Sequence, residues 1–250
     1  MSSTERRATL YGIHTVRVML ERHAARVLMV RIAEQRADAR VRLIEELARR
    51  HHRPVERLDM RSLTQLLGDV AHQGVAADIT PLPPWTEDEL LAALAGAAAP
   101  LFLALDGVQD PHNLGACLRT ADACGALAVI VPRDRAAQLT PAVRKVATGA
   151  AESTAVVAVT NLVRTLKLLK QAGLWVIGAD AAAETPVRQV DLSGPRVLVL
   201  GGEGAGLRRL TRENCDFMVR LPQLGVVESL NVSVAAGMLL YEAVRQRGGG

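Results

Sequence analysis

Six short apolar runs, separated by helical patterns between residues 101 and 247, constrain the fold more than any other feature of the sequence. The runs are LFLAL (101–105), LAVIV (127–131), AVVAV (155–159), LWVIG (174–178), VLVLG (197–201) and FMVRL (217–221). They are almost continuously apolar, which is typical of strands covered on both faces. Helices are expected at Leu114–Cys124, Pro141–Thr148, Asn161–Gln171, Leu207–Arg212 and Val232–Arg247. This alternation predicts an α/β fold, with a parallel sheet and helices on both of its sides.

The first eighty residues predict a second, smaller unit of alternating helices and strands. The expected elements are helix Tyr11–Arg22, strand Arg26–Ile32, helix Asp38–Arg50, strand Val55–Leu58, helix Met60–Leu67 and strand Gly74–Ile79, with Asp38 as a helix cap. Three prolines within residues 80–84 cannot continue a strand or a helix interior, so we place the domain boundary there. We therefore expect a disordered N-terminus (1–9), a small domain (10–80), a linker (81–97) and a larger domain (98–247).

Composition excludes several classes of protein. Of the 250 residues, 49% are hydrophobic and 22% charged, as in globular rather than disordered proteins. No apolar run approaches the roughly 20 residues of a membrane span, and the start MSSTERRATL lacks the apolar core of a signal peptide. The three cysteines form no CxxC pair and the histidines show no metal-ligand spacing. We therefore expect a cytoplasmic protein with reduced core cysteines, no membrane contact and no metal.

The net charge of +4 is carried almost wholly by arginine, because lysine occurs only at positions 145, 167 and 170. Arginine suits bidentate contacts with phosphate, and a basic excess suits a polyanionic partner. A genome biased toward arginine codons explains the same composition equally well. The charge therefore permits a nucleic-acid partner without requiring one.

Polar residues that follow the predicted strands are the candidates for chemistry, because a parallel sheet binds ligands at the carboxyl ends of its strands. They are Asn113, Arg119, Glu203, Glu228, Ser229 and Asn231. Each also has a structural interpretation. These are N-capping for both asparagines, a solvated surface for Arg119, a charge at a helix start for Glu203, and a turn for Glu228 and Ser229. The turn GGEGAGL (201–207) lacks the G-x-G-x-x-G spacing of a dinucleotide fingerprint. It predicts only that bare backbone can approach a ligand.

Three segments together resemble a known pattern. LALDGVQDPHNLGACLRTADACGA, VLVLGGEGAGL and VESLNVSVAAGMLLYE are similar to the three signature motifs of SpoU/TrmH-type RNA 2′-O-ribose methyltransferases, which belong to the SPOUT superfamily. The segment YGIHTVRVML…HQGVAADI resembles the small substrate-binding domain of that family, which is similar to the ribosomal protein L30e fold. The resemblance extends from about Leu10 to Arg247.

The resemblance implies a fold and a cofactor. The SPOUT fold is an α/β fold whose C-terminal part forms a deep trefoil knot, here expected over roughly Val197–Arg247. The family binds S-adenosylmethionine in a bent conformation within the knot, largely through backbone. The positions carried over as cofactor contacts are Gly201, Leu221 and Leu230, with Gly202, Gly204, Pro222 and Ser229 as weaker candidates.

The resemblance also implies catalytic positions, which are Asn113, Arg119, Glu203, Ser229 and Asn231. A ribose 2′-hydroxyl is a poor nucleophile until a base removes its proton. Arginine holds its own proton strongly, so we favour positioning of phosphate and hydroxyl by Arg119 over proton abstraction. The two asparagines are expected to orient the ribose and the loops, and Glu203 to hold Arg119 or the substrate.

The implied partners are RNA, with a guanosine of 23S ribosomal RNA as the expected substrate, and a second copy of the chain. The alternatives are 2′-O-methylation of transfer RNA or of another ribosomal nucleotide, and a non-catalytic RNA-binding protein. The family's homodimer packs through C-terminal helices, where Val234, Met238 and Tyr241 recur at helical spacing. These three residues fit either a dimer surface or the core. In the small domain, an arginine-rich stretch is expected to contact RNA phosphates, or else to form a solvated helix face: Arg26, Arg31, Arg36, Arg40, Arg42, Arg49, Arg50 and Arg53.

Overall fold

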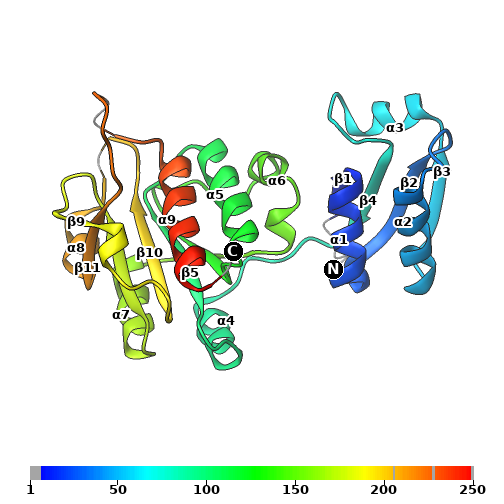
Figure 1. Cartoon of the computed structure of the whole chain (residues 1–250). Helices are drawn as coiled ribbons and strands as arrows, with labels where there is room; N and C mark the ends of the chain where they lie inside the picture. Colours follow the sequence, from blue (N-terminus) through cyan, green and yellow to red (C-terminus); the bar gives the residue numbers. More distant parts are fainter. Residues whose placement is uncertain (1–6, 205, 227–228, 249–250) are drawn as a thin grey trace. The chain divides into compact units, whose positions relative to one another are not determined.

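The computed structural model describes residues 7–204, 206–226 and 229–248, and it divides into two compact units, Met1–Leu82 and Pro83–Gly250 (Figure 1). In the part of the chain that the structure describes, no helix is long and apolar enough to cross a membrane. The three cysteines are free thiols. Burial raises the pKa of the Cys117 thiol to about 12. Burial, followed by the Asp216 carboxylate, raises the pKa of Cys215 to about 12 as well.

The first unit is a four-stranded sheet with strand order β1-β4-β2-β3. Its elements are β1 (Ala8–Tyr11), α1 (Ile13–His23), β2 (Val27–Ala33), α2 (Ala39–Arg50), β3 (Val55–Leu58), α3 (Met60–Leu67) and β4 (Val75–Ile79). Asp38 caps α2 as predicted, since its side chain accepts a hydrogen bond from the Arg40 backbone N–H. Strand β1 pairs antiparallel with β4, so Ala8 and Thr9 belong to the sheet rather than to a disordered terminus.

The second unit contains a seven-stranded sheet, in which every pairing is parallel and the strand order is β7-β6-β5-β10-β8-β11-β9. Its elements are α4 (Glu87–Ala92), β5 (Leu101–Asp106), α5 (Pro111–Ala123), β6 (Ala128–Pro132), α6 (Pro141–Ala147), β7 (Ala155–Val159), α7 (Leu162–Gln171), β8 (Trp175–Ala179), β9 (Thr185–Pro186), β10 (Arg196–Gly201), α8 (Arg209–Glu213), β11 (Phe217–Arg220) and α9 (Val232–Gln246). The predicted α/β class with helices on both faces is confirmed.

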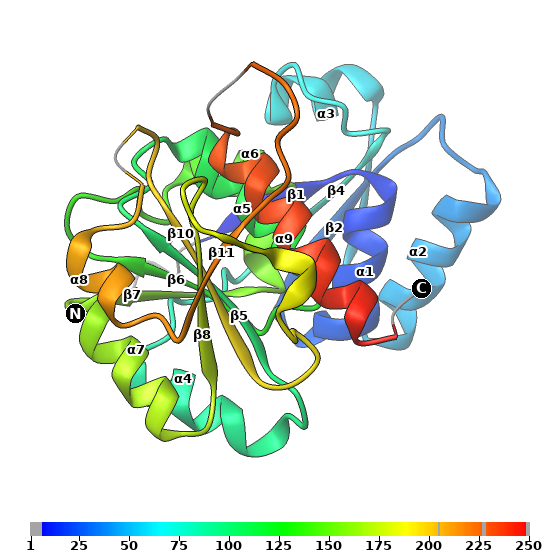
Figure 2. The ribbon, with the colours of Figure 1, turned by 60° about the vertical axis from the view of Figure 1, so that its left-hand side comes forward.

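Helices α5, α6 and α9 cover one face of this sheet, and α4 and α7 lie on the other (Figures 1 and 2). Side chains alternate between the two faces along each strand. Leu101, Leu103 and Leu105 of β5 therefore pack in one cluster with Leu118 of α5 and Leu239 of α9, all of them buried. Because each central strand is buried on both faces, the apolar runs in the sequence are continuous rather than alternating.

The stretch expected to be a linker is partly structured. The Trp85 backbone N–H donates to the Val156 carbonyl at 2.8 Å, and Thr86 and Glu89 form a capping box that starts α4. Contacts place the boundary between Leu82 and Pro83, so residues 83–97 belong with the larger unit. The spacing of Thr86 and Glu89 is a helix-start signature that could have revealed α4 after the prolines.

Candidate active site

The carboxyl ends of β5, β10, β8 and β11 meet at one edge of the larger sheet. From β5 the chain moves outward through β6 and β7, and then crosses to β8 on the far side of β10. Such a reversal of strand order opens a crevice beyond the strand ends, where open α/β sheets bind ligands. Two cavities open there, of about 770 Å³ and about 390 Å³. Gly202, Glu203 and Gly206 line both of them.

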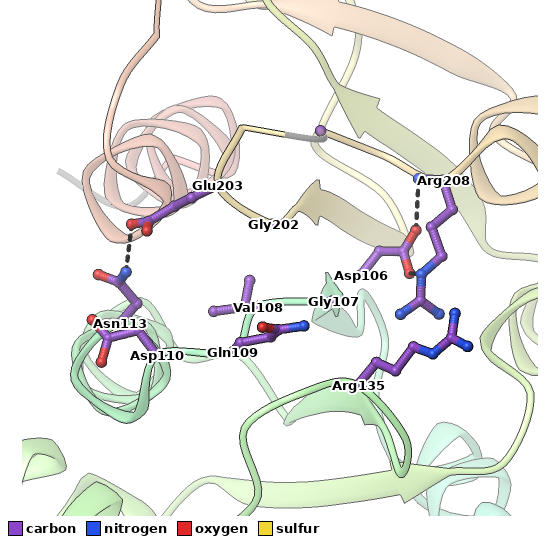
Figure 3. Close-up of a pocket in the computed structure, with 11 residues that line it drawn as sticks. Asp106, Gly107, Val108, Gln109, Asp110, Asn113, Arg135, Gly202, Glu203 and Arg208 are labelled. Atoms are coloured by element: carbon purple, nitrogen blue, oxygen red, sulfur yellow. Dashed lines mark hydrogen bonds and ion pairs between the residues drawn. The ribbon is translucent and has the colours of Figure 1, made fainter.

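Asn113, Glu203 and Asn231 form a hydrogen-bonded network at the junction of the two cavities. The Asn113 Nδ2 group donates to Glu203 Oε1 at 2.6 Å (Figure 3). The Asn231 Nδ2 group donates to the same Glu203 oxygen at 3.2 Å and to Asn113 Oδ1 at 3.1 Å. The structure thus joins three of the five residues that the resemblance implied to be catalytic. We call this triad the amide–carboxylate network.

Local helix starts explain how both asparagines reach the network. Asp110, rather than Asn113, is the N-cap of α5: its side chain accepts from the His112 backbone N–H, with Pro111 in the first turn. The N-capping interpretation of Asn113 is therefore wrong, and its amide is free to bond to Glu203. Asn231 does cap α9, because its Oδ1 accepts from the Ser233 backbone N–H at 2.8 Å. Its Nδ2 donors remain for the network, so capping and site functions coexist in one side chain.

The larger cavity is bounded by residues that follow strands β8, β10 and β11. Gly201, Gly202, Gly204, Leu221, Leu230 and Ser229, all candidates from the sequence, line it. Pro222 is exposed and is not one of the lining residues, and Glu228 lies outside the described residues. The sequence prediction missed Asp180 and Arg212, an ion pair on the cavity wall. The position of Asp180 directly after a buried strand was the available signal.

Glycine is required in the turn after β10 because backbone segments approach one another closely there. A Cβ on Gly201 would lie 1.9 Å from the backbone carbon of Gly206, and one on Gly202 would lie 2.5 Å from the Gly107 carbonyl oxygen. Gly206 itself adopts a φ of 63°, in the left-handed region. This turn therefore exposes bare backbone to the cavity and cannot accommodate a side chain without moving.

We predict that Gly201→Ala weakens cofactor binding by more than about tenfold, because the added methyl group must displace the Gly206 backbone from the cavity wall. Calorimetric titration with S-adenosylmethionine measures the change. Gly96→Ala is the matched control, since nothing lies within 4 Å of a Cβ at Gly96 and this residue lines neither cavity. Equal affinity of the two variants would contradict the prediction.

Arg119 lies apart from the network within a single chain. Its side chain is exposed on α5 and, among the described residues, it has no hydrogen-bond or ion-pair partner. It lines neither of the two cavities. The neighbouring Thr120 faces α9, where a Cβ on Gly237 would lie 3.7 Å from its methyl carbon. Helix α5, which bears Arg119, packs against α9. The α9 side chains Val234, Met238 and Tyr241 are exposed, so they are surface rather than core residues.

The chemistry that this site can perform follows from its groups. The amide N–H donors and the single carboxylate of the network, together with the bare backbone beside it, suit the binding and orientation of a neutral hydroxyl-bearing ligand. The described residues contain no cluster of three or more His, Cys, Asp or Glu side chains that could hold a metal ion. The larger cavity has the size of a cofactor site and the smaller one lies directly beside it. The arrangement suits a transfer between two ligands that meet at the network.

Comparison with known proteins gives consistent matches over nearly the whole chain. Residues 100–241 match the SpoU rRNA Methylase family, and residues 9–85 match the RNA 2′-O ribose methyltransferase substrate binding family. The 23S rRNA (guanosine-2′-O-)-methyltransferase RlmB of Pseudomonas syringae pv. tomato is 54% identical over 241 residues, which are 95% of each chain.

Solved structures give the same result. The SpoU methyltransferase AviRb from Streptomyces viridochromogenes, in complex with AdoMet, aligns with a TM-score of 0.74 at 27% identity, over 98% of this chain and 92% of that one. A structure described as an RNA 2′-O ribose methyltransferase aligns with a TM-score of 0.73 at 26% identity, over 98% of this chain and 90% of that one. The resemblance seen in the three sequence motifs is therefore confirmed.

Proposed function

The chain belongs to the SpoU rRNA methylase family, and we propose that it transfers a methyl group from S-adenosylmethionine to the ribose 2′-hydroxyl of a guanosine in 23S ribosomal RNA. The observation that carries this function is the position of the amide–carboxylate network. Glu203 lines the larger cavity and the smaller one, so a donor in the first and a ribose in the second would meet at its side chain.

The residues of the larger cavity fit the proposed cofactor. Bare backbone at Gly201 and Gly202 allows a flat adenine ring to approach closely, and Leu221 and Leu230 supply apolar walls. When bound, S-adenosylmethionine supplies an electrophilic methyl group on a sulfonium. The proposal includes a trefoil knot over roughly Val197–Arg247, in which the turn after β10 and the segment after β11 hold the cofactor.

The network's part in the reaction is to orient the ribose. Amide oxygens and donors of Asn113 and Asn231 can bond to the ribose hydroxyls, and Glu203 fixes both amides through one shared oxygen. Orientation of reacting groups is worth several orders of magnitude in rate. Ser229, on the wall of the larger cavity beside Asn231, is proposed to contact the bound ligands there.

Arg119 is proposed to enter the site of a second copy of the chain. Val234, Met238 and Tyr241 are 51%, 40% and 66% exposed, and they form one apolar stripe on α9. A homodimer packed through this stripe would bury it, and would bring Arg119, on the neighbouring helix α5, toward the partner's network. There the guanidinium would hold an RNA phosphate and position the hydroxyl rather than accept its proton.

The first unit is proposed to bind structured RNA through an L30e-like domain. Several of its arginines are already engaged, since Arg31 pairs with Asp78 and Glu56, and Arg36 pairs with Asp38. The guanidinium groups of Arg40 and Arg49 are exposed and have no hydrogen-bond or ion-pair partner among the described residues, so they are the stronger candidates for phosphate contacts.

Transfer of a tritiated methyl group from S-adenosylmethionine to unmodified 23S rRNA and to tRNA tests the function. The expected result is label in 23S rRNA, with the modified position mapped to a guanosine ribose. Label in tRNA or in another ribosomal nucleotide would support the alternative substrates within the family. Absence of label, together with absence of calorimetric binding of S-adenosylmethionine, would indicate a non-catalytic RNA-binding protein and overturn the proposal.

A further inference from the structure

Two arginines lie at the end of the smaller cavity opposite the amide–carboxylate network (Figure 3). Arg135 and Arg208 both line this cavity, and their guanidinium groups point into the same space. They also line a further cavity of about 630 Å³, which shares Asp106 and extends to Thr160 and other residues that follow β7. The two cavities form a groove along the carboxyl edge of the sheet, with the arginine pair at their junction.

Arg208 is held in place by a buried carboxylate. Asp106, at the end of β5, is 2% exposed, and its Oδ2 accepts from the Arg208 backbone N–H at 3.0 Å. Its Oδ1 lies 3.5 Å from Arg208 Nε. The terminal nitrogens of Arg208 have no hydrogen-bond acceptor among the described residues, and the side chain is 48% exposed. Asp106 therefore fixes the orientation of the Arg208 guanidinium through its backbone N–H and Nε, and the two terminal nitrogens remain free to donate to a ligand.

Arg135 is held by its loop instead of by a counter-charge. The Gln138 side-chain amide donates to the carbonyl oxygens of Pro132, Arg133 and Ala136, which ties the loop after β6 into one conformation. Arg135 has a φ of 55°, in the left-handed region, which costs a residue with a side chain about 1 kcal/mol. In the described part of the chain its guanidinium has no hydrogen-bond or ion-pair partner. Strained backbone of this kind persists where neighbouring contacts fix it, often at binding sites.

Positive charge exceeds negative charge at this end of the groove, which favours the binding of an anion. Two guanidiniums that face one space repel each other, and Asp106 compensates only one of them. The other acidic side chains of the smaller cavity, Asp110 and Glu203, lie at its opposite end (Figure 3). Asp134 and Arg209 line the neighbouring cavity and add one charge of each sign, so one net positive charge remains, which matches the single negative charge of a phosphodiester. Arginine's planar, forked donors suit phosphate oxygens.

We propose that Arg135 and Arg208 together bind one backbone phosphate of the substrate RNA, adjacent to the nucleotide whose ribose reaches the network. The assignment rests on the proposed function. Asp106 is a positioning residue in this arrangement, because it acts through Arg208. The flanking nucleotide then runs along the groove toward Thr160, and the RNA strand follows the carboxyl edge of the sheet.

The test compares Arg135→Ala, Arg208→Ala and the double variant with Arg188→Ala. Arg188 is an exposed arginine in the short helix Val187–Gln189 and lines none of the three cavities. The affinity of each protein for an unmodified 23S rRNA fragment that contains the mapped site is measured by fluorescence anisotropy over a range of salt concentrations. The affinity for S-adenosylmethionine is measured by calorimetry.

Each single variant is expected to bind the fragment about tenfold more weakly, with unchanged affinity for S-adenosylmethionine. The salt dependence should fall by about 0.7 in the slope of log K against log salt, the value for one phosphate on a single strand. The double variant should lose little more than either single one, because both arginines hold the same phosphate.

RNA affinities equal to that of Arg188→Ala would overturn the assignment, and so would a loss confined to S-adenosylmethionine, which would place these arginines at the cofactor. Methyl transfer by the Arg188→Ala protein distinguishes failure of the phosphate assignment from failure of the proposed function. If that variant and the wild-type protein both methylate 23S rRNA, the function stands whatever the arginine pair binds.

Discussion

Glu203→Ala is expected to lower the turnover of methyl transfer by about a hundredfold while leaving the fold intact, since misplacement of reacting groups by about 1 Å costs this much. The Glu203 Oε1 atom is the shared acceptor for the amides of Asn113 and Asn231. Without it, two donors lose their partner and both amides are free to rotate away from the ribose. Turnover is measured with saturating RNA and S-adenosylmethionine, so that a change in affinity for either of them does not affect the measured rate.

Stability and binding distinguish this effect from unfolding. Glu203 is exposed, so its own removal costs little, while the buried Asn113 loses an acceptor at a cost of about 1–3 kcal/mol. Glu203→Gln keeps a carbonyl oxygen at the same position and is expected to lose only about tenfold in turnover. Glu213→Ala is the matched control, because Glu213 is a surface carboxylate on α8 that pairs with Arg209. Turnover of Glu203→Ala within about threefold of this control would remove Glu203 from the mechanism.

Burial explains which parts of the fold could be predicted from the sequence. Each of the six apolar runs became a strand, with its ends displaced by one residue at most, because a strand buried on both faces requires apolar side chains throughout. Strands β1 and β9 were not predicted. Both lie at sheet edges, where fewer side chains are buried and the backbone pairing leaves little trace in the sequence.

The candidate site shows a different limit. Asn113 and Glu203 are 90 residues apart and Asn231 is 118 residues from Asn113, so only the strand order brings the three together. The resemblance to a family supplied these residues, whereas local patterns indicated helix caps. For Asn113 the signal was misread, since an Asp–Pro pair at 110–111 marks the true helix start. Asp106, Arg135 and Arg208 were missed because single polar residues after strands are common in loops.

Mixed dimers test whether Arg119 acts in the site of the partner copy. Arg119→Ala and Glu203→Ala homodimers are both expected to be nearly inactive, because every site lacks one of the two residues. A heterodimer of the two variants can be isolated through two different affinity tags. If the site is shared between subunits, its activity is higher than that of either parent homodimer. One of its sites then lacks both residues, and the other contains an intact Arg119 from one subunit and an intact Glu203 from the other. Its activity should therefore return to about half that of the wild-type dimer.

The opposite arrangement predicts no recovery. If Arg119 bends back to the network of its own subunit, each site of the heterodimer keeps one defect and the mixture stays as inactive as its parents. Light scattering at micromolar concentration tests whether the chain forms a homodimer at all, since a monomeric protein cannot have a site shared between two subunits. The geometry favours recovery: Arg119 is exposed on α5, which packs against α9, and it lines neither cavity of its own chain, while Asn113, on the same helix, is buried and bonded to Glu203. One helix thus presents one residue inward and another outward, which is the arrangement that a site completed by a second copy requires.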